Sequence, residues 1–318
     1  MPKPLPIIYA PGYNITLWGL QRLHPFDSEK YRKVFEFLRE NDILNGQNHI
    51  VPSPISPESL KTVHGEAYLR LLKRSRIVAG IAEVPPLRWV PNFLLQRRLL
   101  QPMRLATGGT VLGVQLAARH GWAINLSGGY HHAKRTSSSG FCFFADISLA
   151  AYHHLVQHPK HKILIVDLDA HQGNGFADIH GDDPRLPAFD LYNAQIYPQD
   201  LPAREFIKYN YPVPLGTRDL PYLKLLQKEL PKAITAERPD LIIYNAGSDI
   251  YENDPLGQLK VSAAGIVVRD ETVFQLARHH KIPILKVLSG GYTPESANII
   301  GSSIRNLWRK GLIGPVKN

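Results

Sequence analysis

The chain has 318 residues, and 44% of them are hydrophobic, which is enough for a substantial core in one large domain or two ordinary ones. Charged residues make up 20% without a long block of one sign, and there is no low-complexity run or periodic repeat, which excludes a disordered or solenoid protein. The net charge of +10 comes from scattered basic residues without a nucleic-acid motif, so we expect a basic solvated surface and no direct nucleic-acid binding.

The single cysteine, Cys142, rules out an intramolecular disulfide and fits a reducing compartment. Prolines interrupt residues 1–14, where a signal peptide needs a continuous apolar stretch, and no run reaches the roughly 18 apolar residues of a membrane span. We therefore expect no membrane span and a cytoplasmic location, or a nuclear one if the source is a eukaryote.

Apolar runs and helical patterns alternate along the chain. Short, β-rich runs that are apolar on both faces predict strands at residues 6–10, 122–126, 162–168, 241–247 and 282–291. Helical spacing predicts helices at 28–40, with Ser28 as N-cap, and at 109–120, 222–230 and 271–280. This alternation indicates an α/β fold with a parallel sheet covered on both sides. Because no shift in composition marks a boundary, residues 1–318 are expected to form a single domain.

In open parallel sheets the ligand site lies beyond the carboxyl ends of the strands. The run from Ile163 to Gly175, ILIVDLDAHQGNG, ends with Asp167, Asp169 and His171 among its polar residues. Alternate residues of an extended chain point the same way, so Asp169 and His171 can converge on one point. A carboxylate oxygen and an imidazole nitrogen suit Zn²⁺ or a similar divalent ion. The alternative is that the two aspartates cap a turn.

The segment 244–257, YNAGSDIYENDPLG, follows another predicted strand and offers Asp249 and Asp254. Asp249 would be a third ligand, and three protein ligands with an open position are typical of a catalytic metal site. The alternative is an acidic turn, because Asn, Asp, Pro and Gly are common turn residues.

Two further strand ends carry histidines and a phenol. His131 and His132 follow a glycine pair in NLSGGYHHA, and histidine is the natural proton carrier near neutral pH. Tyr292 follows a glycine pair in LSGGYTPE, where its hydroxyl would donate a hydrogen bond to a developing oxyanion. SGGY occurs in both segments, so Tyr130 competes for this role. Together these strand ends supply metal ligands, a base and an oxyanion donor.

The same segments resemble the zinc-dependent histone deacetylases. HHA, GFCFFADI at 140–147, VDLDAHQGNG, NAGSDIYENDPLG and SGGY occur in the order of that family's motifs. The segments 13–27, 85–104, GWAINL and YNAQIYP at 192–198 resemble the class IV branch, and the likeness runs from about residue 7 to about residue 315. It implies the arginase–deacetylase fold, a three-layer α/β/α sandwich on a mainly parallel sheet of about eight strands.

The resemblance also implies ligands for two cations. Asp169, His171 and Asp249 would bind Zn²⁺, and Fe²⁺ can share this ligand set. Asp167 would help to bind a structural monovalent cation such as K⁺, and it would also support His131.

The remaining residues of the family pattern would act on the substrate. His132 corresponds to the general base and later acid, His131 to its electrostatic partner, and Tyr292 to the oxyanion donor. Phe141 and Tyr197 would form the walls of a tunnel around the aliphatic stem of acyl-lysine. The backbone of Gly129 would line the floor of this tunnel.

The chain departs from class I enzymes at three places. Asn174 stands where they have an Asp that supports the second histidine, although class II and IV members also have Asn there. Gln172 stands where many relatives have a second His. No residue matches the acidic anchor of the tunnel rim, and the loop 82–92, AEVPPLRWVPN, reads as apolar, which favours an apolar acyl group.

These observations predict a metal-dependent amide hydrolase that removes acetyl or long-chain fatty acyl groups from lysine side chains of a protein or peptide. A small acylated amine, such as an acetylated polyamine, is the alternative substrate. A binuclear Mn²⁺ ureohydrolase would need an Asp where the chain has Gly173. A non-catalytic metal-binding scaffold is the remaining alternative. Acyl length and oligomeric state stay open at this point.

Overall fold

The computed structural model describes residues 4–17, 19–45 and 48–315. Seven strands in this part of the chain form one sheet in the order β1-β2-β7-β6-β3-β4-β5, and all neighbouring strands are parallel. The strands are β1 (Ile7–Ile8), β2 (Trp122–Asn125), β3 (Ile163–Asp167), β4 (Ala188–Asn193), β5 (Tyr209–Val213), β6 (Leu241–Asn245) and β7 (Ile284–Val287). The parallel sheet expected from the apolar runs is therefore confirmed.

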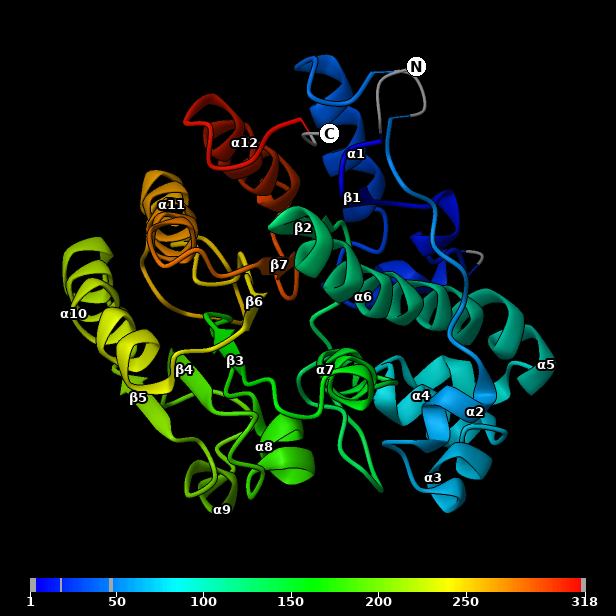
Figure 1. Ribbon diagram of the computed structural model, residues 1–318. Coiled ribbons are helices and arrows are strands. Elements are labelled where there is room, and N and C mark those ends of the chain that lie inside the picture. The colour runs from blue at the N-terminus through cyan, green and yellow to red at the C-terminus, as the bar shows by residue number, and fades with distance from the viewer. Residues whose placement is uncertain (1–3, 18, 46–47, 316–318) are drawn as a thin grey trace.

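Helices cover both faces of the sheet, as Figure 1 shows. One layer contains α1 (Lys30–Glu40), α10 (Asp219–Glu237), α11 (Ala263–His279) and α12 (Ser296–Arg309), and the other contains α6 (Gln101–His120), α7 (Asp146–Gln157) and α8 (Asn174–His180). The shorter helices are α2 (Pro57–Lys61), α3 (Glu66–Leu71), α4 (Ser75–Ile81), α5 (Asn92–Leu95) and α9 (Leu201–Arg204). Among the described residues, no helix combines the length and hydropathy needed to cross a bilayer.

The two faces of the inner strands contribute side chains to two different apolar clusters. Ile163 and Ile165 of β3 pack in the cluster that includes α6 and α7, while Leu164 and Val166 pack in the cluster that includes α10, α11 and α12. Successive side chains of a strand point to opposite faces, and a sheet covered on both sides therefore needs strands that are apolar throughout. This requirement explains why the strands could be recognised as unbroken apolar runs.

Several local expectations need correction. Ser28 does not cap α1, because its hydroxyl donates a hydrogen bond of 2.8 Å to the carbonyl of Ile15 and the N-cap residue is Glu29. In the described residues the sheet has seven strands, close to the number of about eight that was expected, and Ile50 forms an isolated parallel bridge beside Ile8 at its edge. β4 and β5 were not expected at all.

A buried ionic cluster joins the layer of α11 and α12 to the sheet. Asp270 of α11 accepts hydrogen bonds from Arg269, from Lys286 of β7 and from Ser303 of α12. Burial raises the pKa of Asp270, but the positive charges of Arg269 and Lys286 outweigh burial and hold it well below its usual range. The cluster is therefore a set of paired charges inside the core.

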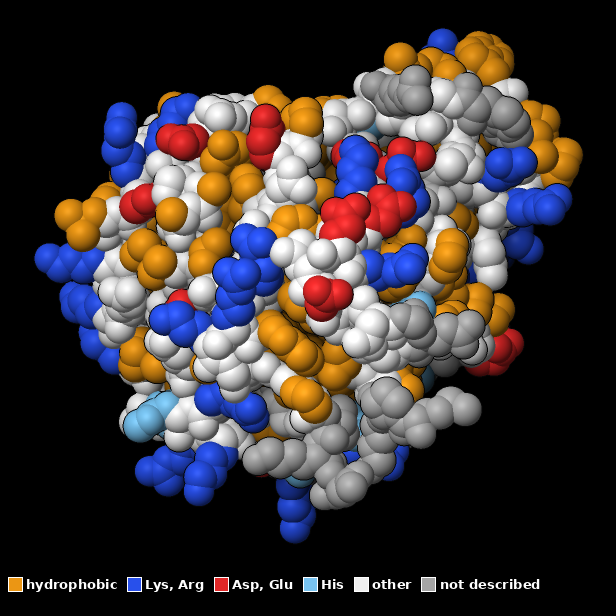
Figure 2. All heavy atoms as spheres, turned by 90° about the horizontal axis from the view of Figure 1, so that it is seen from above, with side chains coloured by type: hydrophobic (Ala, Val, Ile, Leu, Met, Phe, Trp, Pro, Cys, Tyr) orange, Lys and Arg blue, Asp and Glu red, His pale blue; other side chains and the backbone are white. Residues whose placement is uncertain are grey.

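On one face of the molecule the positive charge is dispersed. On the face seen from above in Figure 2, Lys and Arg side chains lie among apolar and neutral ones, and several have Asp or Glu nearby.

Candidate metal and catalytic site

The register of the sheet brings two polar loops side by side. β3 pairs with β6 so that Asp167 lies opposite Asn245, and the loops that follow these strands leave the same edge. The guanidinium of Arg269 donates hydrogen bonds to the carbonyl of Leu168 at 3.1 Å and to the carbonyl of Gly247 at 2.5 Å. One buried side chain thus ties both loops together just before their acidic residues.

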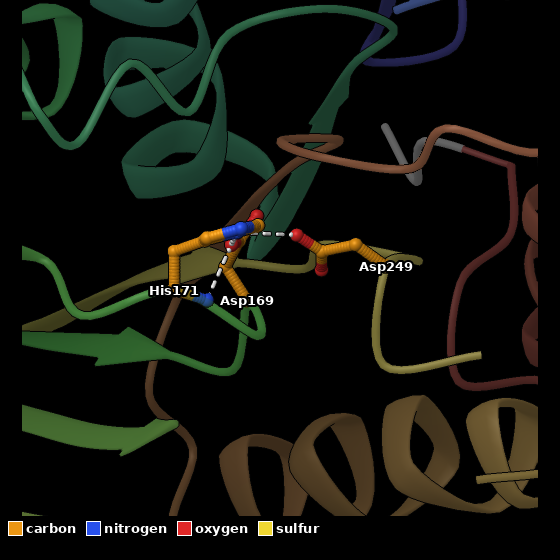
Figure 3. Close-up of side chains that lie close together, drawn as sticks. All are labelled: Asp169, His171 and Asp249. Atoms are coloured by element: carbon orange, nitrogen blue, oxygen red, sulfur yellow. Dashed lines mark hydrogen bonds and ion pairs between the residues drawn. The ribbon is translucent and has the colours of Figure 1, made fainter. Parts of the chain in front are cut away.

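Asp169, His171 and Asp249 form a buried group at this edge, shown in Figure 3. One potential ligand atom from each lies within 4.8 Å of the other two. Nδ1 of His171 is 2.9 Å from Oδ2 of Asp249 and 3.0 Å from Oδ1 of Asp169. Two carboxylates and one imidazole at these distances fit a divalent ion such as Zn²⁺, which takes oxygen and nitrogen ligands at about 2.0–2.2 Å.

The protonation of this group reflects two acids held together out of water. Burial raises the pKa of Asp249, and the nearby charge of Asp169 raises it further, to about 7. Burial lowers the pKa of His171, but its contacts with Asp169 and Asp249 outweigh burial and raise it to about 10. Without a cation the imidazole compensates the two carboxylates, which is the task that a bound divalent ion would take over.

Further bonds fix the orientation of the two carboxylates. Oδ2 of Asp169 accepts hydrogen bonds from the hydroxyl of Ser289 at 2.7 Å and from the N–H of Gly290 at 2.9 Å. A Cβ atom on Gly290 would lie 2.4 Å from Oδ2 of Asp249 and 2.7 Å from Oδ2 of Asp169. The first residue of the GGY sequence is therefore glycine because the backbone passes directly against both carboxylates.

His131 and His132 lie in the loop after β2 with ring centroids 4.2 Å apart, and each has its own partner. Nδ1 of His131 donates to Oδ2 of Asp167 at 2.7 Å. Burial lowers the pKa of His131, but the charges of Asp167 and Asp169 outweigh it and raise the pKa to about 9. For His132, burial and then the positive charge of His131 hold the pKa well below its usual range. The pair therefore combines a charged and a neutral imidazole.

Asn174 sets the tautomer of His132. Its Nδ2 donates to Oδ2 of Asp200 at 3.0 Å, so its Oδ1 faces His132 and accepts a hydrogen bond from Nδ1 at 2.9 Å. Nε2 of His132 is left as the basic nitrogen. Gln172 has a structural task, because its side chain exchanges two hydrogen bonds with the backbone of Asp200. Sequence reasoning missed Asp200, which follows Asn174 by 26 residues and belongs to no motif.

A cleft of about 380 Å³ opens onto these residues. Its lining includes His132, His171, Tyr197 and Tyr292. Tyr197 is 43% exposed, and its ring centroid lies 5.0 Å from that of His132. Burial raises the pKa of Tyr292 well above its usual value, so its hydroxyl keeps its proton and can donate it.

Phe141 and Gly129 line a small adjoining pocket of about 30 Å³. Tyr130 also lines it, but its hydroxyl forms a hydrogen bond of 3.1 Å with the hydroxyl of Ser127. Of the two tyrosines that follow SGG, Tyr292 is the one on the cleft. Asp254 is not part of the metal group, because its Oδ2 accepts the N–H of Tyr292 at 2.8 Å and its Oδ1 caps the turn that follows.

The loop 82–92 had suggested an apolar mouth for the cleft, but the mouth also contains a charged group. Glu83 lines the cleft, and its Oε2 lies 3.3 Å from Nε2 of His24. The hydrogen bond with His24 lowers the pKa of Glu83, so this half-exposed carboxyl is ionised at neutral pH. Sequence reasoning missed both residues because neither follows a strand of the sheet.

A second acidic pair lies behind the histidines. Asp190 of β4 is opposite Asp167 in the sheet, and both carboxyls are fully buried. Oδ2 of Asp190 accepts the N–H of Gly173 at 2.9 Å, while Oδ1 has no hydrogen-bond partner among the described residues. An unpaired buried carboxylate oxygen beside a second carboxylate is a suitable ligand for a cation.

A larger hollow, of about 780 Å³, lies elsewhere on the described surface. Its lining includes Lys134, Arg135, His180 and Phe206, and none of the metal-group residues. The cleft beside Asp169, His171 and Asp249 is therefore the candidate site because buried titratable groups converge there, and not because of its size.

Comparison with known proteins gives a consistent result. The pattern of the family described as "Histone deacetylase domain" matches residues 24–307. "Histone deacetylase 2" of Arabidopsis thaliana is 46% identical over 307 residues, which is 96% of this chain and 79% of that protein. "Probable deacetylase" of Archaeoglobus fulgidus is 27% identical over 86% of this chain and 78% of its own length. The crystal structure of the HDA15 HD domain, at 21% identity, superposes with a TM-score of 0.77 over 98% of this chain and 90% of that chain, which establishes a shared fold.

Proposed function

Because this chain belongs to the histone deacetylase family, whose members hydrolyse amides, we propose that it is a zinc-dependent lysine deacylase of the class IV branch. The observation that carries the proposal is the position of one neutral histidine and one protonated tyrosine beside the buried group of Asp169, His171 and Asp249. The class IV assignment rests on the segments 13–27, 85–104 and 192–198.

Asp169, His171 and Asp249 would hold the metal. When bound, Zn²⁺ supplies Lewis-acid polarisation of the amide carbonyl and lowers the pKa of a water molecule. Fe²⁺ could take the same place, because the donor set of two carboxylates and one imidazole is not specific for one ion.

His132 is the general base of the proposed reaction. Its Nε2 takes a proton from the attacking water, because Nδ1 already donates to Asn174. The same nitrogen then returns the proton to the departing lysine amine. His131, charged and held by Asp167, stays protonated and adds positive charge beside the reacting group.

Tyr292 donates its hydroxyl proton in a hydrogen bond to the oxyanion of the tetrahedral intermediate. Tyr197 and Phe141 would flank the aliphatic stem of the acyl-lysine, and the backbone of Gly129 would line the inner end. Gly129 has a φ of +90°, and a Cβ there would lie 2.3 Å from Oδ1 of Asn245, so a side chain at this position would distort the pocket.

The substrate proposal depends on the rim. Glu83 is an ionised carboxylate at the mouth of the cleft, and it can accept hydrogen bonds from the backbone N–H groups of an acyl-lysine peptide. The same carboxylate can pair with the ammonium group of a small acylated polyamine, which keeps that substrate as the second candidate. The aromatic side chains beside the cleft suit long acyl chains as well as acetyl.

We also propose that Asp167 and Asp190 hold a structural cation such as K⁺. The support is the buried Oδ1 of Asp190, which has no hydrogen-bond partner among the described residues. A cation there would compensate the negative charge that Asp167 and Asp190 place behind His131.

The test is a ladder of acetyl-, octanoyl- and myristoyl-lysine peptides, with acetylated polyamine in parallel, assayed before and after chelation. Activity on the long chains that chelation removes and Zn²⁺ restores is the expected result. Activity on acetyl-lysine alone would assign a conventional deacetylase, and activity on the polyamine alone would assign the small-amine function. His132→Ala is the control, and turnover that persists in this variant would contradict the proposed base.

A further inference from the structure

One segment has a strong excess of basic over acidic residues. Residues 67–104 contain eight basic residues and a single acidic one, Glu83, so their formal charge is +7 out of +10 for the whole chain. The segment comprises α3 after its first residue, α4, the short helix η3 (Pro85–Trp89), α5, the short helix η4 (Gln96–Leu100) and the first turn of α6. In Figure 1, α5 lies at the outer edge of the molecule, on the side away from α10 and α11.

Hydrogen bonds hold two turns of this segment against each other. The hydroxyl of Ser75 donates to the carbonyl of Val90 at 2.7 Å. The carbonyl of Leu72 accepts from Nδ2 of Asn92 at 3.2 Å and from Nε2 of Gln96 at 2.8 Å. The turn between α3 and α4 therefore lies beside the turn between η3 and α5. Their exposed side chains form what we call the basic aromatic ridge, made of Lys73, Arg74, Arg76, Arg88, Trp89 and Phe93.

The ridge exposes two large aromatic side chains among cations. Trp89 is 78% exposed and Phe93 is 70% exposed, which are among the highest values for large apolar residues in the described chain. The guanidinium of Arg88 lies 5.0 Å from the ring of Trp89. None of the four basic residues of the ridge forms an ion pair with an acidic residue in the part of the chain that the structure describes. Exposed apolar side chains that gather in one patch, unlike scattered single ones, are typical of a contact surface.

The ridge also lies close to the mouth of the cleft. Glu83 lines the cleft, and Arg88 follows it by five residues, a distance that an extended chain cannot make longer than about 17 Å. The N–H of Phe141 donates to the carbonyl of Ile81 at 2.9 Å. This bond connects the end of α4 to Phe141, which lines the small pocket beside the cleft. A surface that binds the ridge would thus be near the entrance used by the substrate.

We propose that the basic aromatic ridge docks this protein on anionic lipid bilayers. Trp favours the interface between lipid and water, and Lys and Arg are drawn to anionic headgroups. Exposed aromatic tips surrounded by unpaired cations are typical of such peripheral contacts. The inference does not depend on the proposed deacylase activity. If both hold, the cleft is presented to acyl-lysines that lie at a membrane surface.

The first experiment is flotation of the full chain with vesicles of phosphatidylcholine alone and of phosphatidylcholine with phosphatidylserine. Binding is expected only to the anionic vesicles and should weaken as salt rises. Replacing Lys73, Arg74 and Arg76 by Gln should weaken it about 10²-fold, because each basic residue near an anionic surface contributes about 1 kcal/mol. The matched control replaces Arg278, Lys281 and Lys310 by Gln at the ends of α11 and α12 and should retain binding.

A second measurement uses tryptophan fluorescence to test whether Trp89 contacts the lipid. The tryptophan emission of the wild-type chain should shift to the blue on addition of anionic vesicles, and Trp89→Phe should lose most of that shift. Turnover of a soluble acyl-lysine peptide should be unchanged in the ridge variants, which separates this inference from the proposed function. Equal loss in the control triple variant, or binding to RNA or acidic peptide without binding to vesicles, would overturn the lipid assignment. Absence of any wild-type binding would overturn it as well.

Discussion

Asn174 and Gln172 looked like departures from a more familiar pattern, and each has a defined partner in the structure. Both side chains meet at Asp200, which is also bound by Nζ of Lys134 at 2.7 Å. Asn174 carries no charge, but its fixed amide imposes one tautomer on His132. Asn174 thus orients His132 as an aspartate would. Because Asn174 adds no negative charge, the positive charge of His131 acts on His132 without being offset at this position.

Asp200→Ala should lower kcat about 10- to 100-fold with little change in KM, because Asn174 would no longer be held with Oδ1 towards His132. Steady-state kinetics on an acyl-lysine peptide measures this effect. Lys134→Ala is the control, since it removes an ion pair with Asp200 but keeps the bond to Asn174. An equal loss in both variants would show that Asp200 acts only through local stability.

Tyr292→Phe should reduce turnover by about 10²–10³-fold, the usual cost of removing an oxyanion donor. The aromatic ring at position 292, whose centroid lies 6.1 Å from that of His171, stays in place in this variant. The melting temperature should therefore hardly change. Turnover equal to the wild type would contradict the assignment of this hydroxyl.

At the scale of elements, the ionic cluster around Asp270 connects three of them, β7, α11 and α12. Asp270→Asn would leave Arg269 and Lys286 as buried cations without a counter-charge, and the expected loss of stability is about 3–5 kcal/mol. Urea unfolding gives the value. Asp183→Asn removes a surface pair with Arg185 and should cost less than about 1 kcal/mol. Comparable losses in the two variants would contradict the role of burial.

His64 makes stability depend on pH. Its Nδ1 donates to the carbonyl of Lys134 at 3.0 Å, and its Nε2 accepts the N–H of Ala145 at 3.0 Å. Burial lowers its pKa from 6.5 to about 4. The unfolded chain therefore binds more protons between these values, so this contribution is complete above pH 6.5 and is lost as the pH falls towards 4.

The corresponding measurement is the free energy of unfolding across that pH window for the wild type and His64→Gln. The variant should show a shallower decline, because Gln can still accept the N–H of Ala145 without taking up a proton. Identical slopes would show that other groups account for the acid sensitivity.

The burial of each strand decides whether the sequence could predict it. β2, β3, β6 and β7 are buried on both faces, so the apolar runs revealed them. β4 contains Asp190 and Asn193 although it is equally buried, and edge strand β5 is partly exposed and contains Pro212. Neither strand shows an apolar run, because polar partners or solvent satisfy its side chains instead.

At the scale of the whole molecule, the topology of the sheet explains why the clustering of Asp169, His171 and Asp249 could be predicted, whereas the residues at the mouth of the cleft could not. Asp169, His171 and Asp249 follow strands that pair in one sheet, so the rule for parallel sheets brings their loops together. Glu83 reaches the same cleft from a connection between two short helices, and no periodic pattern links it to His24, 59 residues away.

Metal binding should be visible in the stability of the whole chain. Zinc content of one ion per chain is expected, and two would revive the binuclear alternative. Removing the ion should lower the melting temperature, because a ligand at a thousandfold excess over its Kd stabilises the folded state by about 4 kcal/mol. Calorimetry with and without chelator measures this difference. Asp249→Ala should show no such difference, and a shift of wild-type size in that variant would contradict the ligand assignment.

The guanidinium of Arg269 binds the carbonyls of Leu168 and Gly247, one residue before Asp169 and two before Asp249. An arriving ion would therefore meet donors that the fold has already fixed, instead of wrapping a loose loop around itself. Affinity at such a site should follow the general ranking of first-row divalent ions. Which of zinc and iron occupies the site would then depend on how much of each ion the cell supplies.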